Sequence, residues 1–291
     1  MSPETRPDPL EGVAAEPGVA KPDPVLTVSN VRRSFGGITA VDVDHLEIQR
    51  GLITGLIGPN GAGKTTLFNL LTGFDTPDAG TWTFAGEDLA GVPAHLVARK
   101  GMVRTFQLTK ALARMTVMEN MQLAAVGQTG ERLFPSLLPT LWRGQEAEIT
   151  ARADELLKRF KLDHMRDEFS GTLSGGQKKL LEMARALMVE PSMVMLDEPM
   201  AGVNPALTQS LLGHVKGLRD NEGRTVVFVE HDMDVVFDIS DWVVCLAQGA
   251  VIAEGRPSEI GSNPAVIDAY LGSSHAEAPV QRRKRHERRA S

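Results

Sequence analysis

The spacing of apolar residues changes along the chain and separates regions with different expected structures. Residues 25–31 and 41–48 alternate apolar with polar side chains, which is typical of half-exposed antiparallel strands. Later apolar runs are short and unbroken, as in strands buried on both faces: 52–57, 193–196, 225–229 and 242–247. Helical patterns separate the last three runs. We therefore expect an α/β domain with a mostly parallel core sheet and an N-terminal antiparallel β-subdomain.

The stretch from about 108 to 184 lacks a strong strand pattern. Residues 115–126, 146–160 and 175–189 instead have helical spacing, which predicts an α-helical subdomain inserted into the domain. The periodic pattern as a whole covers residues 25–272. Residues 1–24 are rich in Pro, Ala and acidic side chains and are expected to form a disordered leader, and residues 273–291 a basic disordered tail.

Composition narrows the class of protein. The chain has 291 residues, a formal net charge of −6 and 42% hydrophobic residues, as expected for a soluble globular protein. Its longest apolar run, residues 242–247, is too short to cross a bilayer, and the N-terminus lacks the pattern of an export signal. Cys245 is the only cysteine, which excludes an internal disulfide and is compatible with a reducing cytoplasm.

A glycine-rich segment follows the apolar run that ends at Ile57. It has the pattern G-x-x-x-x-G-K-[ST] of a phosphate-binding loop, in which glycines with positive φ turn successive backbone N–H groups toward an anion. A helix from Lys64 to about Thr72 adds the positive end of its dipole. Lys64 would contact the β- and γ-phosphates of a nucleotide, and the Thr65 hydroxyl would bind Mg²⁺. The nucleotide-binding residues predicted here are Gly58, Pro59, Asn60, Gly61, Ala62, Gly63, Lys64, Thr65 and Thr66.

Two carboxylates follow the apolar run 193–196. Asp197 and Glu198 would lie at the carboxyl end of a parallel strand, where open α/β sheets bind ligands. Asp197 would hold Mg²⁺ through its water shell, and Glu198 would polarise the water that attacks the γ-phosphate. Without the phosphate loop, a solvated strand end would be the better explanation of this pair.

A second anion site is predicted at the start of the helix 175–189. Ser174 and the N–H groups of Gly175 and Gly176, within the motif that ends at Gln177, form this site. One nucleotide needs only one phosphate nest within a subunit. We therefore expect the second site to close over a nucleotide that is bound to another copy of the chain.

These three motifs, in this order, resemble the nucleotide-binding subunit of an ABC transporter over about residues 25–272. The resemblance implies a head-to-tail dimer, in which the second nucleotide-binding subunit is either identical or a paralogue. Two ATP molecules with Mg²⁺ would lie between the subunits. Each would be held by the phosphate loop of one subunit and by Ser174, Gly175, Gly176 and Gln177 of the other. The implied activity is ATP hydrolysis.

The resemblance assigns three further residues. Gln107 matches a glutamine at the junction with the helical subdomain that contacts Mg²⁺ and responds to the membrane partner. His231 matches a histidine that contacts the γ-phosphate, and Phe35 matches an aromatic side chain that stacks on adenine. For Phe35, a core position at a strand end is the alternative. The implied catalytic residues are Lys64, Gln107, Glu198 and His231, and the implied metal-binding residues are Thr65, Gln107 and Asp197.

One position departs from the family pattern. Asn204 stands where many members carry an aspartate that bridges the dimer interface. An amide keeps the ability to hydrogen-bond but has no charge. The resemblance therefore does not support an electrostatic role at this position.

Four segments, residues 34–42, 197–205, 230–236 and 263–272, resemble the ATPases of branched-chain amino acid importers. This resemblance implies two transmembrane permease subunits, a separate solute-binding protein and a peripheral location on the cytoplasmic face of the membrane. ATPases for urea, short amides or lipopolysaccharide are the alternatives within the group. The apolar insert 131–144 would either cover the helical subdomain or contact a permease.

Other classes fit less well. A soluble ABC ATPase of DNA repair or translation usually has two nucleotide domains or a long coiled-coil insert, whereas this chain has one phosphate loop and a short insert. A P-loop kinase or GTPase has no use for the motif 173–177. The basic tail would bind nucleic acid only weakly, so we expect no specific nucleic-acid partner. A solvated tail and a contact with the anionic membrane surface are its other interpretations.

Overall fold

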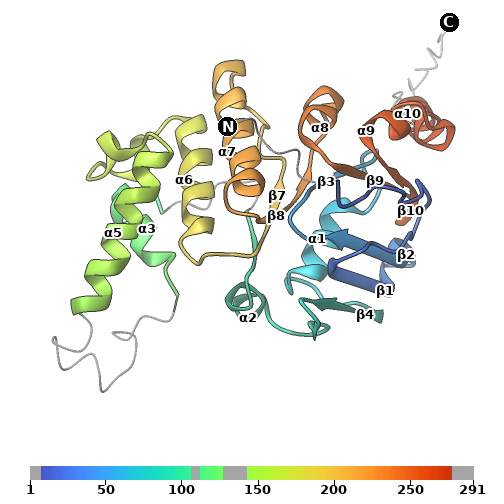
Figure 1. Ribbon diagram of the computed structural model, residues 1–291, viewed down its shortest axis with the longest axis horizontal. Helices are drawn as coiled ribbons and strands as arrows, with labels where there is room; N and C mark the ends of the chain where they lie inside the picture. Colours follow the sequence, from blue (N-terminus) through green and yellow to red (C-terminus); the bar gives the residue numbers. More distant parts are fainter. Residues whose placement is uncertain (1–7, 106–111, 127–142, 277–291) are drawn as a thin grey trace, which may run out of the picture.

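The computed structural model describes residues 8–105, 112–126 and 143–276. It contains a four-stranded sheet, a six-stranded core sheet, and helices that pack on the core sheet or gather at one end of the molecule (Figure 1). The predicted α/β class, with an antiparallel N-terminal sheet and a mostly parallel core sheet, is confirmed. Among the described residues, no helix is long and apolar enough to span a membrane.

The N-terminal sheet has the order β2-β1-β4-β5, and all of its pairings are antiparallel. In β2, Val41 and Val43 are buried while Asp42 and Asp44 are exposed, so the alternation in the sequence places one face of the sheet on an apolar core. Both predicted strands are present and extend beyond their predicted ends. The strands are β1 (Pro24–Phe35), β2 (Ile38–Gln49), β4 (Ala79–Phe84) and β5 (Glu87–Asp88).

The core sheet has the order β10-β9-β3-β8-β7-β6. Four of its strands match the predicted apolar runs: β3 (Ile53–Ile57), β7 (Met193–Asp197), β8 (Thr225–Val229) and β9 (Trp242–Ala247). The edge strands β6 (Met102–Arg104) and β10 (Ala250–Gly255) were not predicted. All pairings are parallel except that of β10 with β9. The segments that follow β3, β7 and β8 therefore meet at one edge of the sheet.

Two apolar cores lie on the two faces of the core sheet. Ile53 and Ile57 of β3 belong to the core that includes residues of α6, α7 and α8. Leu56 belongs to the opposite core, which includes α1 and the N-terminal sheet. Because neighbouring strand residues point to opposite faces, a sheet that is covered on both sides is apolar at every position. This is why its strands appear in the sequence as unbroken apolar runs.

The start of α7 depends on Asn204. The Asn204 side chain accepts a hydrogen bond from the N–H of Leu207 at 3.0 Å, and Pro205 occupies the first helical position. The residue that departs from the family pattern is thus a helix cap in this subunit. The helices outside the helical subdomain are α1 (Lys64–Leu71), α2 (Ala94–Arg99), α7 (Pro205–Asp220), α8 (Met233–Ile239), α9 (Pro257–Ile260) and α10 (Pro264–Ala276).

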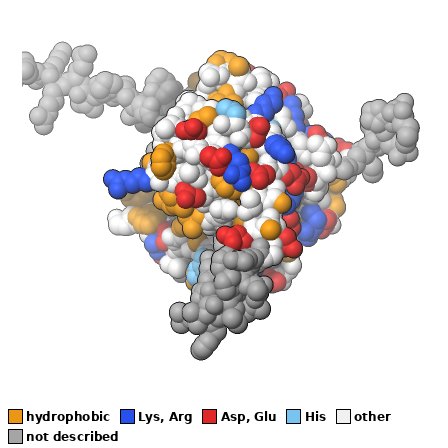
Figure 2. All heavy atoms as spheres, turned by 90° about the vertical axis from the view of Figure 1, so that its left-hand side faces the viewer, with side chains coloured by type: hydrophobic (Ala, Val, Ile, Leu, Met, Phe, Trp, Pro, Cys, Tyr) orange, Lys and Arg blue, Asp and Glu red, His pale blue; other side chains and the backbone are white. Residues whose placement is uncertain are grey.

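Among the described residues, the helical subdomain at one end of the molecule (Figure 1) contains α3 (Val117–Leu123), α5 (Arg143–Arg159) and α6 (Gly175–Leu187). They correspond to the three predicted helices, with ends that differ by a few residues. Two short 3₁₀ turns, Asp163–Met165 and Ser170–Thr172, connect α5 to α6. Figure 2 shows acidic and basic side chains interspersed over this end of the molecule. Most of the apolar insert, residues 131–142, lies outside the described residues, as do residues 277–291 of the predicted tail. Residues 273–276, which were predicted to begin the disordered tail, instead continue helix α10.

Residues 8–23 correct the prediction of a disordered leader, because they pack against the domain. Leu10 is fully buried in the core that includes the N-terminal sheet. The carboxylate of Glu254 on β10 accepts hydrogen bonds from the backbone N–H groups of Gly18 and Val19, at 2.6 and 3.1 Å, and from Nζ of Lys21 at 2.8 Å. Pro- and Ala-rich composition predicts disorder when a segment has too little to bury. Here the buried carboxylate of Glu254 accepts the hydrogen bonds that hold residues 18–21 on the domain.

Candidate active site

The segment 58–65 connects β3 to α1, as predicted. Gly58, Gly61 and Gly63 have φ angles of 145°, 78° and 99°. A Cβ atom on Gly58 would lie 2.1 Å from the carbonyl oxygen of Leu246, and one on Gly63 would lie 2.1 Å from that of Ala40. Only glycine therefore fits the first and last of these positions, because the loop passes directly against neighbouring backbone.

Lys64 folds back under its own loop. Its ammonium group donates to the carbonyl oxygens of Gly58 at 2.5 Å and Pro59 at 3.0 Å. Burial lowers the pKa of Lys64, and the nearby carboxylates of Glu198 and Asp197 act in the opposite direction. The loop itself is accessible from solvent through its exposed members, Asn60, Gly61 and Thr65.

Asp197, Glu198 and His231 lie at the same edge of the core sheet. Strand β7 ends at Asp197, which is opposite Val229 of the parallel strand β8. His231 comes two residues after β8, and its Nε2 atom lies 2.5 Å from Oε1 of Glu198. Lys64 follows β3, which lies beside β8 in the sheet, so the structure brings four of the predicted residues to the same edge of the sheet.

Glu198 has a backbone conformation that is uncommon for a residue with a side chain. Its φ is 48°, in the left-handed region. Its N–H donates to the carbonyl oxygen of Val229 at 3.0 Å, and Lys179 of α6 donates to its carbonyl oxygen at 3.2 Å. Contacts from two other elements thus hold Glu198 in place, a pattern found at functional sites.

Glu230, which has no role in the sequence prediction, supports the Glu198–His231 pair. Its carboxylate accepts hydrogen bonds from the N–H of Met200 at 2.8 Å and of His231 at 3.3 Å. Burial raises the pKa of Glu230, and these two hydrogen bonds oppose the rise. The side chain thereby links the segments that follow β7 and β8. The sequence gives no signal for this role, because a glutamate that follows a strand is usually exposed to solvent. The burial of Glu230 in the structure reveals it.

Arg104 pairs with Asp197, and no sequence motif indicates this contact. Its Nη2 atom lies 2.6 Å from Oδ2 of Asp197, with both side chains buried. Its Nη1 atom donates to Oδ1 of Asn69 at 2.5 Å, and the guanidinium lies 5.5 Å from the ring centroid of Phe68. Because β6 is next to β7 in the sheet, Arg104 ends its strand beside the predicted metal ligand.

The motif 174–177 opens α6. The Ser174 hydroxyl accepts from the N–H of Gln177 at 3.3 Å, and the Gln177 side chain accepts from the N–H of Ser174 at 2.9 Å, which is a capping box. Figure 1 shows α6 in the helical subdomain, separated from α1 by α7 and the core strands. The structure therefore does not bring Ser174, Gly175 and Gly176 to the phosphate loop of the same subunit.

Phe35 lies at the end of β1 and 48% of its surface is exposed. The guanidinium of Arg33 lies 4.7 Å from the centroid of the Phe35 ring, and Arg33 is itself paired with Asp75 and Asp78. The ring is thus an accessible platform, and the alternative of a core position is wrong. Gln107 lies outside the described residues.

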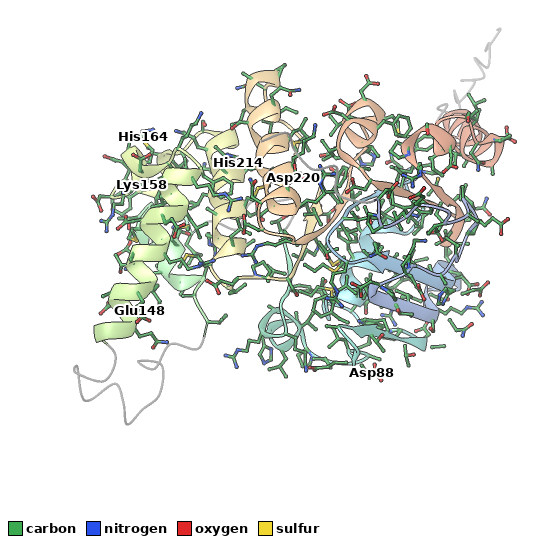
Figure 3. The ribbon with its side chains drawn as sticks, viewed as in Figure 1. Asp88, Glu148, Lys158, His164, His214 and Asp220 are labelled. Carbon is green, nitrogen blue, oxygen red and sulfur yellow. The ribbon has the colours of Figure 1, made fainter. Side chains whose placement is uncertain are left out.

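His214 is a histidine whose ring packs between helices and lies outside the site. It lies on the side of α7 that faces the helical subdomain (Figure 3), with its ring centroid 4.4 Å from that of Phe160. Burial lowers the pKa of His214, and the positive charges of Arg159 and Lys161 lower it further. This histidine joins α7 to the end of α5 and is not part of the edge that holds His231.

The parallel core sheet, the glycine loop and the carboxylates at its edge define an ATP-binding cassette. Residues 41–201 match the family model described as ABC transporter, and residues 250–276 match one described as branched-chain amino acid ATP-binding cassette transporter. The chain belongs to the ABC transporter family and is an ATP hydrolase.

One relative and two solved structures show the extent of the similarity. The chain is 42% identical to the probable branched-chain amino acid transport ATP-binding protein LivG of Archaeoglobus fulgidus, over 87% of this chain and 97% of the relative. An ATP-binding cassette of an ABC transporter in its ADP conformation is 36% identical, with a TM-score of 0.73 over 86% of this chain and 99% of that one. A dimeric cassette in a post-hydrolysis state with ADP and phosphate is 25% identical, with a TM-score of 0.66 over 80% and 98%.

Proposed function

We propose that the chain is the ATP-hydrolysing subunit of an importer for branched-chain amino acids. The contact between Glu198 and His231, at the sheet edge that also carries Lys64, is the observation that supports its chemistry. The named relative and the match of residues 250–276 support branched-chain amino acids as the cargo. Selection of the cargo belongs to the permeases and to a separate solute-binding protein.

Nucleotide binding uses the loop and one aromatic ring. The phosphates bind against the loop N–H groups and the start of α1, where the Lys64 ammonium exchanges its own loop carbonyls for phosphate oxygens. Adenine stacks on the exposed ring of Phe35, which Arg33 holds in position. The positive φ angles of its glycines give the loop the curvature that this task requires.

Hydrolysis depends on Glu198. Its carboxylate accepts a proton from the water that attacks the γ-phosphate, which is the step that a general base accelerates. His231 touches the same carboxylate at 2.5 Å, so it orients Glu198 and can contact the γ-phosphate from the adjacent strand end. Glu230 holds the segment that follows β7 and the segment that follows β8 together, through its hydrogen bonds with the N–H groups of Met200 and His231.

The donor atoms beside the loop suit Mg²⁺, which takes oxygen ligands and keeps much of its water shell. Thr65 is exposed at the start of α1, which follows β3, and Asp197 ends β7, which is separated from β3 in the sheet by β8; the Oδ2 atom of Asp197 is held by Arg104. We assign Thr65 and Asp197 to the metal, with Gln107 as the third predicted ligand. The bound ion would neutralise charge on the phosphates.

A second nucleotide-binding subunit completes the site. Ser174, Gly175 and Gly176 form a helix start that lies apart from the loop of their own subunit. A helix start of this kind binds phosphate well, and the similar cassette of known structure is dimeric. We infer that Ser174–Gln177 closes over the nucleotide of the partner, in a dimer of identical or paralogous subunits.

The permease contact is inferred from exposed apolar side chains beside the segment that carries Gln107. Leu112 and Phe169 are 46% and 56% exposed. They lie close together, since Ser170 donates to the carbonyl oxygen of Leu112 at 2.9 Å. Exposed apolar residues in a cluster mark interaction sites. A permease subunit seated here, one of the two in the transporter, would hold the chain at the cytoplasmic face of the membrane.

Transport in cells tests this proposal. A strain in which Lys64→Ala replaces the parent chain should lose uptake of radiolabelled leucine, isoleucine and valine, while uptake of urea and acetamide is unchanged. Lys158→Ala is the matched control, because Lys158 is an exposed lysine on α5, outside the site (Figure 3). Loss of urea or acetamide uptake with normal leucine uptake would assign the other cargo. Normal uptake of every solute would contradict the transport function.

A further inference from the structure

Tyr270 contacts the phosphate loop from the far end of the chain. It is the only tyrosine and lies on α10. Its hydroxyl oxygen accepts a hydrogen bond from the N–H of Gly58, at 2.8 Å and across 212 residues of sequence. Gly58 is the first glycine of the loop, so the contact is made where β3 turns into the loop.

The N–H of Gly58 needs such a partner. Pairing of β3 with β9 ends at Ile57, which is opposite Cys245, and Gly58 itself is buried. A buried backbone donor without an acceptor is costly. At φ 145° the Gly58 backbone has also left the strand conformation, and the pairing of β3 with β8 ends earlier, at Leu56. The Tyr270 hydroxyl supplies the acceptor.

The surroundings of Tyr270 suit a fixed acceptor. Burial raises the pKa of Tyr270 to about 12, so its hydroxyl is neutral over the physiological range. Cys245 is opposite Ile57, the residue before the loop; burial raises the pKa of its thiol to about 12, and the Lys64 ammonium opposes the rise. Helix α10 is attached to the domain through Val266, which is buried in the core shared with α8 and the core sheet. The hydroxyl is therefore carried by a helix that is packed in place.

We propose that Tyr270 is a positioning residue for the phosphate loop. By holding the first N–H, it keeps the next N–H groups directed at the phosphates before nucleotide arrives, so that less ordering is required on binding. Residues 250–276, which match the second family model, thereby contribute to nucleotide affinity. This inference rests on the proposed assignment of the loop 58–66 to phosphate.

Tyr270→Phe in the full chain tests the proposal, because it keeps the ring and removes the acceptor. The dissociation constant for ADP with Mg²⁺, measured by isothermal titration calorimetry, should rise about three- to tenfold. The KM for ATP should rise by a similar factor while kcat stays within about twofold of the parent. Ile267→Ala is the matched control, since Ile267 is an exposed side chain on the same helix. It should leave both constants unchanged.

A second measurement uses the unsubstituted chain. Because there is one tyrosine, 3-fluorotyrosine labelling gives a single ¹⁹F resonance, and that resonance should shift when ADP saturates the loop. A resonance that does not move, or an ADP affinity of Tyr270→Phe within about twofold of the parent, would overturn the proposal. So would an equal loss in Ile267→Ala. Lys64→Ala distinguishes failure of the Tyr270 proposal from failure of the proposed phosphate site. If Lys64→Ala binds ADP like the parent, the assignment of the loop to phosphate is itself wrong.

Discussion

A buried ion pair between the leader and β10 determines whether residues 8–23 belong to the folded domain. The Nζ atom of Lys21 lies 2.8 Å from Oε2 of Glu254, and the two side chains are 1% and 0% exposed. Glu254 also accepts hydrogen bonds from the N–H groups of Gly18 and Val19 and from Nε1 of Trp242, at 2.6, 3.1 and 2.9 Å. The Lys21 ammonium lies 4.5 Å from the centroid of the Trp242 ring.

Lys21→Met keeps most of the aliphatic stem and removes the charge. Removing one partner of a buried pair costs about 3–5 kcal/mol. Three donors stay on Glu254, so we expect a loss near the lower end, about 3 kcal/mol in the free energy of unfolding. In a chain of this size, that loss lowers the Tm by about 6–12 °C. Urea unfolding followed by tryptophan fluorescence measures it, with Trp242 as a reporter in the cluster itself.

Arg50→Met is the matched control. Arg50 pairs with Asp23 of the leader at 3.0 Å, but the two side chains are 45% and 59% exposed, so its loss should cost less than about 1 kcal/mol. Combining Lys21→Met with Glu254→Gln should cost less than the sum of the single changes, because no unpaired buried charge remains. If Lys21→Met costs no more than Arg50→Met, the leader does not stabilise the domain through this pair.

Four further outcomes follow from the site and its supports. An amide cannot accept the proton of water, so Glu198→Gln should bind ATP like the parent and release phosphate more than about tenfold more slowly. Hydrolysis closer to the parent rate would show that Glu198 is not the general base. Ser174→Arg should preserve nucleotide binding by the monomer and prevent ATP-driven dimerisation in size-exclusion chromatography. If monomer binding and dimerisation are lost equally, residues 174–177 act on the nucleotide of their own subunit. Asn204→Ala should lower the free energy of unfolding by about 1 kcal/mol through loss of the α7 cap, and urea curves that superimpose on the parent's would contradict this. Tyr270 has a folded pKa of about 12 against an ordinary 10.0, so its neutral form stabilises the fold below pH 10, and this contribution is lost as the pH rises toward 12. Tyrosinate absorbance should titrate near 12 in the native chain and near 10 in urea, and a native midpoint near 10 would show an unburied hydroxyl.

Local sequence determined the parts of this protein that depend on local physics. Strands β3, β7, β8 and β9 were predictable because burial on both faces demands an unbroken apolar run. The loop 58–65 was predictable because positive φ at its glycines is a property of each residue by itself. The meeting of Glu198 and His231 was predictable in outline, since parallel strands end at one edge of a sheet.

Tertiary structure decided which side chains support these parts. Tyr270 reaches Gly58 across 212 residues, and Arg104 reaches Asp197 across 93. A periodic pattern reports whether a position is buried, but it does not identify the donor or acceptor that meets it there. Edge strands such as β6 and β10 have one neighbour and a weak pattern, yet they carry Arg104 and Glu254. The leader is ordered for the same reason: a buried carboxylate on β10 needs donors, and residues 18–21 supply them.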